Sequence, residues 1–328
     1  MQKVYLLLVV IAMAFFSGCV GEEVPQETQA PTKTTPATQT MEYANPDALI
    51  DASWVAQHKD DSNVKIISTP SIKERYDDGH IQGALYVDYR TDIVDLDASV
   101  ENQMASMDKV EELLKSLGIK NSDTIVVYDD VNNMVAARMF NVLSFYGHGD
   151  VRLLNGGKNA WTRSGGELSE EVSTINPSDY SAREKSEAEY VDLEYVYDSL
   201  DNLDVIIVDA RPADQYTGEN IRPGIGRGGG HIPGAINVPG GKSWDEDKEI
   251  KSYEELKAIY EDAGVTKDKR IVVYCHNGLL SSYSWYVLNQ LLGYPDVAVY
   301  DGSSLEWSNN PDVPLVMGSE PGEVPMDM

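Results

Sequence analysis

Residues 270–285 read RIVVYCHNGLLSSYSW. The apolar run at 270–274 does not alternate with polar residues, which predicts a strand covered on both faces of a parallel sheet. A tight loop follows at 276–280, where Gly278 permits backbone angles that other residues resist. From Ser281 the pattern becomes helical, with Ser281 or Ser282 as the predicted N-cap. The helix would carry one apolar face and end at a glycine: Trp285, Leu288, Leu292 and Gly293.

Cys275 lies between this strand and this helix. A thiol there would meet backbone N–H groups and the positive end of the helix dipole, which favour the thiolate. The thiolate is the nucleophilic form of cysteine. The local pattern therefore predicts a nucleophile, or alternatively a small buried hydrophobic residue at a strand end.

The N-terminus has the pattern of a processed segment, with Lys3, an apolar run at 4–16, and then Ser17-Gly18-Cys19. The run is too short to span a bilayer comfortably. The segment resembles the signal peptide and lipobox of prokaryotic lipoproteins, which implies a signal peptide over residues 1–18 and a lipidated Cys19. A plain or uncleaved secretory signal is the alternative. We expect an extracytoplasmic protein tethered to the cell membrane as a lipoprotein.

Residues 19–42 are rich in Thr, Pro and Gln and contain too few apolar residues for a core, which predicts a disordered tether. The chain contains two cysteines, so lipidation of Cys19 would leave Cys275 as a lone free thiol. Such a thiol is unusual outside the cytoplasm and favours a reactive role. The net charge of -28 argues against binding to nucleic acid or to anionic lipid.

An internal repeat divides the rest of the chain. The sequence IVVY occurs at 125–128 and again at 271–274, and GHIQGA at 79–84 corresponds to GHIPGA at 230–235. We therefore infer a duplication. An alignment without gaps places Asp129 on Cys275. It predicts that the N-terminal copy is chemically silent and forms a wall of the site, with Asp129 and Asp130 as a solvated loop pair.

Each copy alternates apolar strands with amphipathic helices, which is typical of an α/β domain with a parallel sheet. The predicted strands are 64–68, 124–128, 151–154, 205–209, 270–274 and 297–300, and two of the predicted helices are 107–117 and 253–263. Ligands bind beyond the carboxyl ends of such strands, where Cys275 lies. We predict an N-terminal domain at 43–172, a linker at 173–188, a C-terminal domain at 189–316 and a disordered tail at 317–328.

With these features the chain resembles the tandem-domain rhodaneses, the thiosulfate and 3-mercaptopyruvate sulfurtransferases, over roughly residues 45–316. The most specific stretches are VDAR at 208–211, YTGE at 216–219, GGHIPGAINVP at 229–239 and VYDGS at 299–303 with Glu306-Trp307. The resemblance implies two tandem rhodanese-like domains, each a mainly parallel sheet flanked by helices. It also implies that Cys275 is the catalytic residue and that the first domain lacks one.

The mechanism implied by the resemblance is a two-step transfer. Cys275 attacks the outer sulfur of a small sulfur-containing anion, the first product leaves, and a persulfide remains. A thiophilic acceptor such as cyanide, a thiol or a protein then takes that sulfur. The transfer needs no metal and no organic cofactor.

The active loop departs from both substrate classes. Thiosulfate enzymes of the family have basic residues directly after the cysteine and five residues after it, where this chain has His276 and Leu280. His276 would be charged part of the time at neutral pH. Mercaptopyruvate enzymes have a loop of small polar residues, which this chain does not reproduce. We predict that the whole loop contacts substrate: His276, Asn277, Gly278, Leu279 and Leu280.

A glycine-rich insert at 221–230, absent from the N-terminal copy, contains Arg222 and Arg227. Arg222 falls near a carboxylate-binding arginine of the mercaptopyruvate enzymes, and an arginine fork can hold a carboxylate or a sulfonate. We predict that both arginines bind substrate, or alternatively that the insert is a flexible loop with solvated arginines. Asp209, Arg211 and His231 are predicted to support the site structurally.

Thiosulfate sulfurtransferase is the function we expect first. The alternatives are a 3-mercaptopyruvate sulfurtransferase, a non-catalytic persulfide carrier or binding module for a partner protein, and a degenerate pair of domains kept for interaction. A rhodanese-related phosphatase would have a loop one residue longer that closes on an arginine, where this chain has Ser281.

Overall fold

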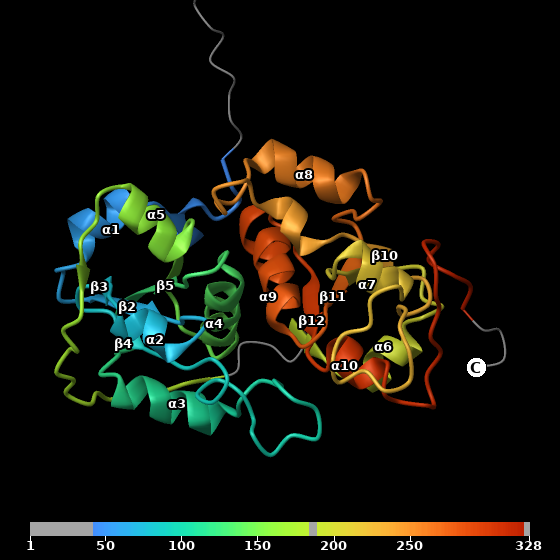
Figure 1. The fold of residues 1–328 in the computed structure, drawn as a ribbon, viewed down its shortest axis with the longest axis horizontal. Helices are drawn as coiled ribbons and strands as arrows, with labels where there is room; N and C mark the ends of the chain where they lie inside the picture. The colour runs from blue at the N-terminus through green and yellow to red at the C-terminus, as the bar shows by residue number, and fades with distance from the viewer. Residues whose placement is uncertain (1–41, 184–188, 325–328) are drawn as a thin grey trace, which may run out of the picture. The chain divides into compact units, whose positions relative to one another are not determined.

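The structure is a computed structural model, and it describes residues 42–183 and 189–324. The predicted signal peptide and Cys19 lie outside the described residues, as does the tether up to residue 41. The described chain contains two α/β units that repeat one architecture (Figure 1).

The first unit is built on a parallel five-stranded sheet. In spatial order its strands are β1 (Leu49–Ile50), β6 (Val151–Leu154), β5 (Thr124–Tyr128), β2 (Val64–Ser68) and β4 (Leu85–Tyr86). Its helices are α1 (Ala52–His58), α2 (Lys73–Asp77), α3 (Met107–Ser116), α4 (Met134–Phe145) and α5 (Gly157–Arg163). A short antiparallel pair joins β3 (His80–Ile81) to β7 (Leu168–Ser169).

The second unit repeats this plan in a second parallel sheet. Its strands, in spatial order, are β10 (Ile236–Asn237), β9 (Val205–Asp209), β11 (Arg270–Tyr274), β12 (Val297–Tyr300) and β8 (Tyr190–Val191). Its helices are α6 (Leu193–Asp198), α7 (Ala213–Thr217), α8 (Tyr253–Glu261), α9 (Leu279–Trp285) and α10 (Ser303–Trp307). The six predicted strands have the observed bounds, so these predictions are confirmed.

The central strands explain the continuous apolar runs, because both of their faces are buried. Ile271 and Val273 of β11 point into one hydrophobic cluster, while Val272 and Tyr274 point into another. The first of these clusters continues from one sheet to the other. Helices α4 and α9 lie side by side within it, and Phe140 packs edge to face on Tyr286 with 4.8 Å between ring centroids (Figure 1).

The two copies differ in register between the loop that follows β5 or β11 and the next helix. In each copy the residue before the helix is left-handed: Asn133, with φ of 65°, and Gly278, with φ of 89°. The loop from Asp129 to Asn133 is thus one residue longer than the loop from Cys275 to Gly278. The segment between Gly278 and Gly293 is in turn one residue longer than the segment between Asn133 and Gly147, and a π-helical turn at Tyr286–Leu291 accommodates this residue. Gly147 and Gly293 are therefore equivalent positions again. The gap-free alignment is therefore wrong within the loop, because Asn133 corresponds to Gly278 and not to Leu279.

Two further predictions need correction. The helix after Cys275 begins at Leu279 with Gly278 as N-cap, so Ser281 and Ser282 lie inside its first turn. The tail is ordered over its described part, because the Gly318 N–H donates to Thr217 O at 2.9 Å and the Glu320 carbonyl contacts His231. These contacts hold residues 318 and 320 on the second domain.

The segment between the domains also packs on a domain over its described part. Tyr180 is buried with its hydroxyl 3.1 Å from His148 Nδ1, and Ser178 N donates to Lys115 O at 3.0 Å. Residues 173–183 are thus an extension of the first domain rather than a free linker.

Candidate active site

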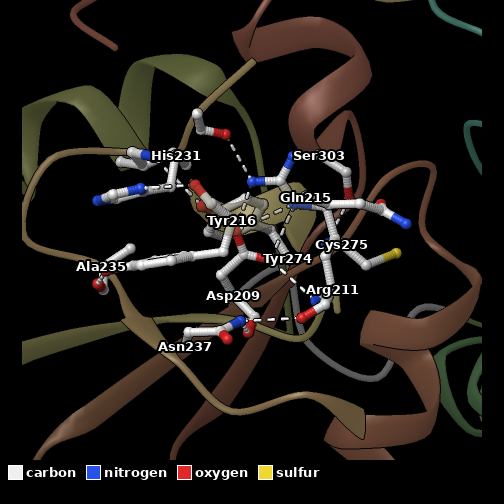
Figure 2. Close-up of polar contacts among 12 residues, drawn as sticks. Asp209, Arg211, Gln215, Tyr216, His231, Ala235, Asn237, Tyr274, Cys275 and Ser303 are labelled. Carbon is white, nitrogen blue, oxygen red and sulfur yellow. Dashed lines mark hydrogen bonds and ion pairs between the residues drawn. The ribbon is translucent and has the colours of Figure 1, made fainter. Parts of the chain in front are cut away.

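Cys275 directly follows β11 and is buried, with 2% of its surface exposed. Ser281 Oγ donates a hydrogen bond to the sulfur at 3.5 Å. In Figure 2 the sulfur points away from the pair formed by Asp209 and Arg211. The thiol thus lies at the carboxyl end of the central strand and faces the first turn of α9, as the sequence pattern predicts.

Backbone and side-chain bonds fix the residues around the thiol. The Cys275 N–H donates to Ser303 Oγ at 3.2 Å, while its carbonyl accepts from Ser304 N at 3.0 Å. The His276 carbonyl accepts from Leu305 N at 3.0 Å. The start of α10 therefore holds both peptide groups that follow β11.

Behind the thiol, Asp209 and Arg211 form a buried ion pair (Figure 2). Arg211 Nη2 also donates to the Gly230 carbonyl at 2.8 Å. The ring of His231 contacts two backbone carbonyls through its two nitrogens, those of Tyr216 at 2.9 Å and Glu320 at 3.1 Å. These contacts support a structural role for all three residues, because their polar atoms are used within the fold.

The sequence reasoning missed Arg138, which reaches the catalytic loop from α4 of the first domain. Its Nη1 lies 2.6 Å from Asp301 Oδ1, and its side chain is 1% exposed. The same nitrogen lies 3.4 Å from Ser282 Oγ in the first turn of α9, and Nη2 donates to Asn102 O at 3.0 Å. Arg138 is the one charged residue in the apolar helix 134–145, which was the available signal.

The first domain also supplies a wall of the site. Asp301 Oδ2 accepts from the Met104 N–H at 2.6 Å, and this bond fixes the end of the loop 94–104 beside the catalytic loop. A cavity of about 640 Å³ is lined by Glu101 and Asn102 of that loop together with His276 and Asn277. A second cavity, of about 440 Å³, is lined by Glu101, Asn102, Asn277 and Leu279 among others.

Some of the predicted substrate-binding residues of the loop line a cavity, and others do not. His276, Asn277 and Leu279 line these cavities. Gly278 is buried, and a side chain there would meet Asp301 Oδ1 at 2.8 Å, so its role is to let the loop pass close to that carboxylate. Leu280 packs on Gly240 and the hydrophobic core and lines neither cavity. The structure thus does not bring Leu280 to a place where it could contact substrate.

His276 differs from expectation in its charge. Burial, together with the charges of Arg222 and Arg211, lowers the pKa of His276 to about 4. The ring is therefore neutral at pH 7, and the expectation of a partial positive charge is wrong. No cation adjoins Cys275 in the sequence to attract an anionic donor.

The two arginines of the insert have different surroundings. Arg222 is exposed and lines a small pocket with His276 and Arg211. Arg227 donates to the carbonyls of Asn310 and Val313, the latter at 2.7 Å, and so fastens the insert to the segment after α10. Of these two arginines, Arg222 is the one whose side chain lines a pocket beside His276.

The loop of the first domain is closed by Asp129. This carboxylate is 1% exposed and accepts four backbone N–H bonds, at 2.9 to 3.1 Å, from Val131, Asn133, Val135 and Ala136. Asp130 accepts from Ser71 N at 2.7 Å. The prediction of a solvated pair is wrong, because Asp129 is buried and its carboxyl oxygens fill the loop as acceptors of these four backbone bonds.

Over 42–183 and 189–324, no cluster of three or more His, Cys, Asp or Glu could hold a metal ion. Within the same ranges, no helix has the length and apolar character needed to cross a bilayer.

Comparison with known proteins agrees with the two-domain organisation. The Rhodanese-like domain family matches residues 51–164 and 192–310. The "Sulfur carrier protein TtuD" of Thermus thermophilus is 40% identical over 289 residues, which are 85% of this chain and 100% of that protein. The "Putative thiosulfate sulfurtransferase SseA" of Mycobacterium bovis is 37% identical over 290 residues, covering 87% and 95% of the two chains.

Solved structures share the fold. The crystal structure of SseA from Escherichia coli, described with the catalytic mechanism of 3-mercaptopyruvate sulfotransferases, superposes with a TM-score of 0.71 and 28% identity, over 78% of this chain and 98% of that one. The anaerobic ergothioneine biosynthesis enzyme from Chlorobium limicola superposes with a TM-score of 0.74 and 26% identity, over 84% and 71%. The chain therefore belongs to the rhodanese family of sulfurtransferases and consists of two tandem rhodanese-like domains.

Proposed function

We propose that this sulfurtransferase works through a persulfide on Cys275. The observation that carries the proposal is the placement of a single thiol at the end of β11, with the Ser281 hydroxyl directed at its sulfur and with cavities beside the next two residues. The hydroxyl hydrogen bond stabilises negative charge on the sulfur.

The transfer proceeds in two displacements. The Cys275 thiolate attacks the outer sulfur of thiosulfate, a new S–S bond forms, and sulfite leaves with the electron pair of the old bond. The thiolate of an acceptor, or cyanide, then attacks the outer sulfur of the persulfide. The Cys275 thiolate leaves and is ready for another cycle.

Thiosulfate is the donor we propose. The name of the Mycobacterium bovis relative supports it, and Arg222 supplies an exposed cation close to His276. The alternative small donor is 3-mercaptopyruvate, named for the enzymes of the Escherichia coli structure. The test is turnover of the full chain with each donor and cyanide. Arg222→Ala should raise KM for the preferred donor, whereas Arg227→Ala should lower stability without that KM effect.

A second candidate function is sulfur carriage between proteins. It is favoured by the neutral state of His276 and by the name of the Thermus thermophilus relative. A carrier would hold the persulfide but turn over small donors slowly. Persulfide formation without turnover to cyanide would select this function.

We also propose that the protein is a lipoprotein, with Cys19 as the anchor, on the sequence pattern alone. The lipid would hold both rhodanese-like domains at the outer side of the cell membrane. Metabolic labelling with a fatty acid tests this, because label should be lost in Cys19→Ala and kept in Cys275→Ala.

A further inference from the structure

The space beside the catalytic loop is larger than a small sulfur anion requires. The two cavities, of about 640 and 440 Å³, share Glu101, Asn102 and Asn277 in their linings, so they are neighbours beside the loop that follows Cys275. Each volume is of the size that holds a drug-sized ligand. We call the two cavities together the trough. Its size fits a substituted thiol or a peptide segment better than a single ion.

The charges around the trough are mainly negative. Its lining includes three carboxylates, those of Asp95, Glu101 and Glu306. Asp95 and Glu101 are exposed, whereas Glu306 is half-buried, and its burial raises the pKa of its carboxyl group. The lining has one cation, Arg90, whose guanidinium lies 4.4 Å from the centre of the Tyr89 ring.

The other cations near the loop do not neutralise the negative charge of the carboxylates that line the trough. Arg138 is paired with Asp301, and Arg211 is paired with Asp209. Arg222 lines a separate small pocket with His276. A positively charged group in the trough would therefore be attracted, and a negatively charged one repelled.

The trough also offers apolar contact at its rim. Leu96 lines the second cavity and is 66% exposed, which is high for a leucine. It follows Asp95 directly. An apolar side chain beside a carboxylate is the combination that binds a segment with mixed basic and apolar residues.

We propose that the acceptor of the Cys275 sulfur is a thiol on a basic segment of a partner protein, which binds in the trough through Asp95, Glu101 and Leu96. This rests on the proposed persulfide function and adds the acceptor class to it. The acceptor thiolate attacks the outer sulfur of the persulfide, having released its proton to water. The Cys275 thiolate leaves, and the acceptor becomes the new persulfide.

The experiment compares small thiols that differ in charge. The full chain is first loaded with sulfur, and loading is verified by protein mass. Sulfur loss is then timed with cysteamine, which is cationic, and with thioglycolate, which is anionic. Each rate is divided by the rate of the same thiol with a small uncharged disulfide, which removes intrinsic differences in nucleophilicity.

We expect the corrected rate for cysteamine to exceed that for thioglycolate by about fivefold to tenfold at low salt, with the ratio falling at high salt. Glu101→Gln should reduce the ratio. Asp97→Asn is the matched control, because Asp97 is exposed on the same loop and lines neither cavity. Basic and acidic thiol peptides should repeat the preference.

A corrected ratio of one, or a preference for thioglycolate, would overturn the proposed acceptor class while leaving the persulfide intact. An effect of Asp97→Asn equal to that of Glu101→Gln would show that general surface charge, and not the trough, selects the thiol. Failure of every donor to load the protein would overturn the proposed function itself, and this proposal with it.

Discussion

Arg138 and Asp301 join the two domains at the catalytic loop, with 2.6 Å between Nη1 and Oδ1. Arg138 comes from α4 of the first domain, and Asp301 follows β12 of the second. Gly278 passes so close to this pair that a Cβ there would lie 3.3 Å from Nη1. The catalytic loop is therefore shaped by a residue of the domain that carries no cysteine.

Replacing Arg138 by Met should destabilise the protein by about 3–5 kcal/mol, because it leaves the Asp301 carboxylate without its buried partner. Sulfur transfer should fall as well, since the Arg138 contacts with Ser282 and Asn102 hold both the helix after the loop and the wall of the site. Urea unfolding and steady-state turnover measure the two effects.

Arg163→Met is the matched control for that change. Arg163 also crosses between the domains, to Glu249, but both side chains are 41% exposed. Its loss should cost about 0–1 kcal/mol. Equal losses of stability in the two variants would contradict the role given to burial of the Arg138 pair.

Ser303 has a left-handed backbone, with φ of 54°, although it is not glycine. The equivalent residue of the first domain is Gly157, with φ of 55°. Such a conformation costs a non-glycine residue about 1–2 kcal/mol. A serine at this strained position provides what a glycine could not, a hydroxyl that accepts a hydrogen bond from the Cys275 N–H.

Ser303→Gly should therefore keep the stability of the protein within about 1 kcal/mol, since relief of strain offsets the two hydrogen bonds of the hydroxyl, to the Cys275 N–H and to the Tyr300 carbonyl. It should lower kcat roughly fivefold to tenfold, because the nucleophile loses a positioning contact. Ser303→Ala keeps the strain and should be the less stable variant. Full activity of Ser303→Gly would show that the hydroxyl does not position Cys275.

Asp129 should be essential to the stability of the first domain and dispensable for chemistry. Burial raises the pKa of Asp129, and the four N–H donors oppose that shift. Asp129→Asn would turn an NH₂ group toward two of these donors and should cost about 1–3 kcal/mol. Urea unfolding measures this, with Asp97→Asn as an exposed control. An unchanged unfolding midpoint would contradict the role given to the four hydrogen bonds that Asp129 accepts.

His276 should stay neutral until the pH approaches 4. The unfolded chain takes up this proton near pH 6.5, so it binds more protons than the folded protein between about pH 6.5 and 4. Folding stability should therefore fall as the pH is lowered through that window, and less so in His276→Gln. An NMR titration of the ring gives the pKa directly, and a midpoint above 6 would contradict the burial argument.

The sequence was most informative where burial determines the pattern. Strands β5 and β11 were predicted to the residue, because both faces of a central parallel strand are covered and the run of apolar residues is continuous. Cys275 was found because it lies at the end of such a strand. These features depend on local sequence and on one general rule of sheet topology.

Contacts between distant segments were not predictable in the same way. Nothing near Arg138 in the sequence indicates that it reaches Asp301, because the contact depends on how α4 packs against α9. The start of α9 was misplaced, because Gly278 caps it through a left-handed backbone while the serines resemble caps. Asp129 was misjudged, because the backbone donors around it arise only when the loop closes.

Persulfide formation on Cys275 is tested by the mass of the intact protein after reaction with thiosulfate, before any acceptor is added. The wild-type chain should gain the mass of one sulfur atom on Cys275 and release one sulfite, while Cys275→Ala should gain nothing. A wild-type chain that forms no persulfide with any sulfane donor, or sulfur bound equally by Cys275→Ala, would contradict this role of Cys275.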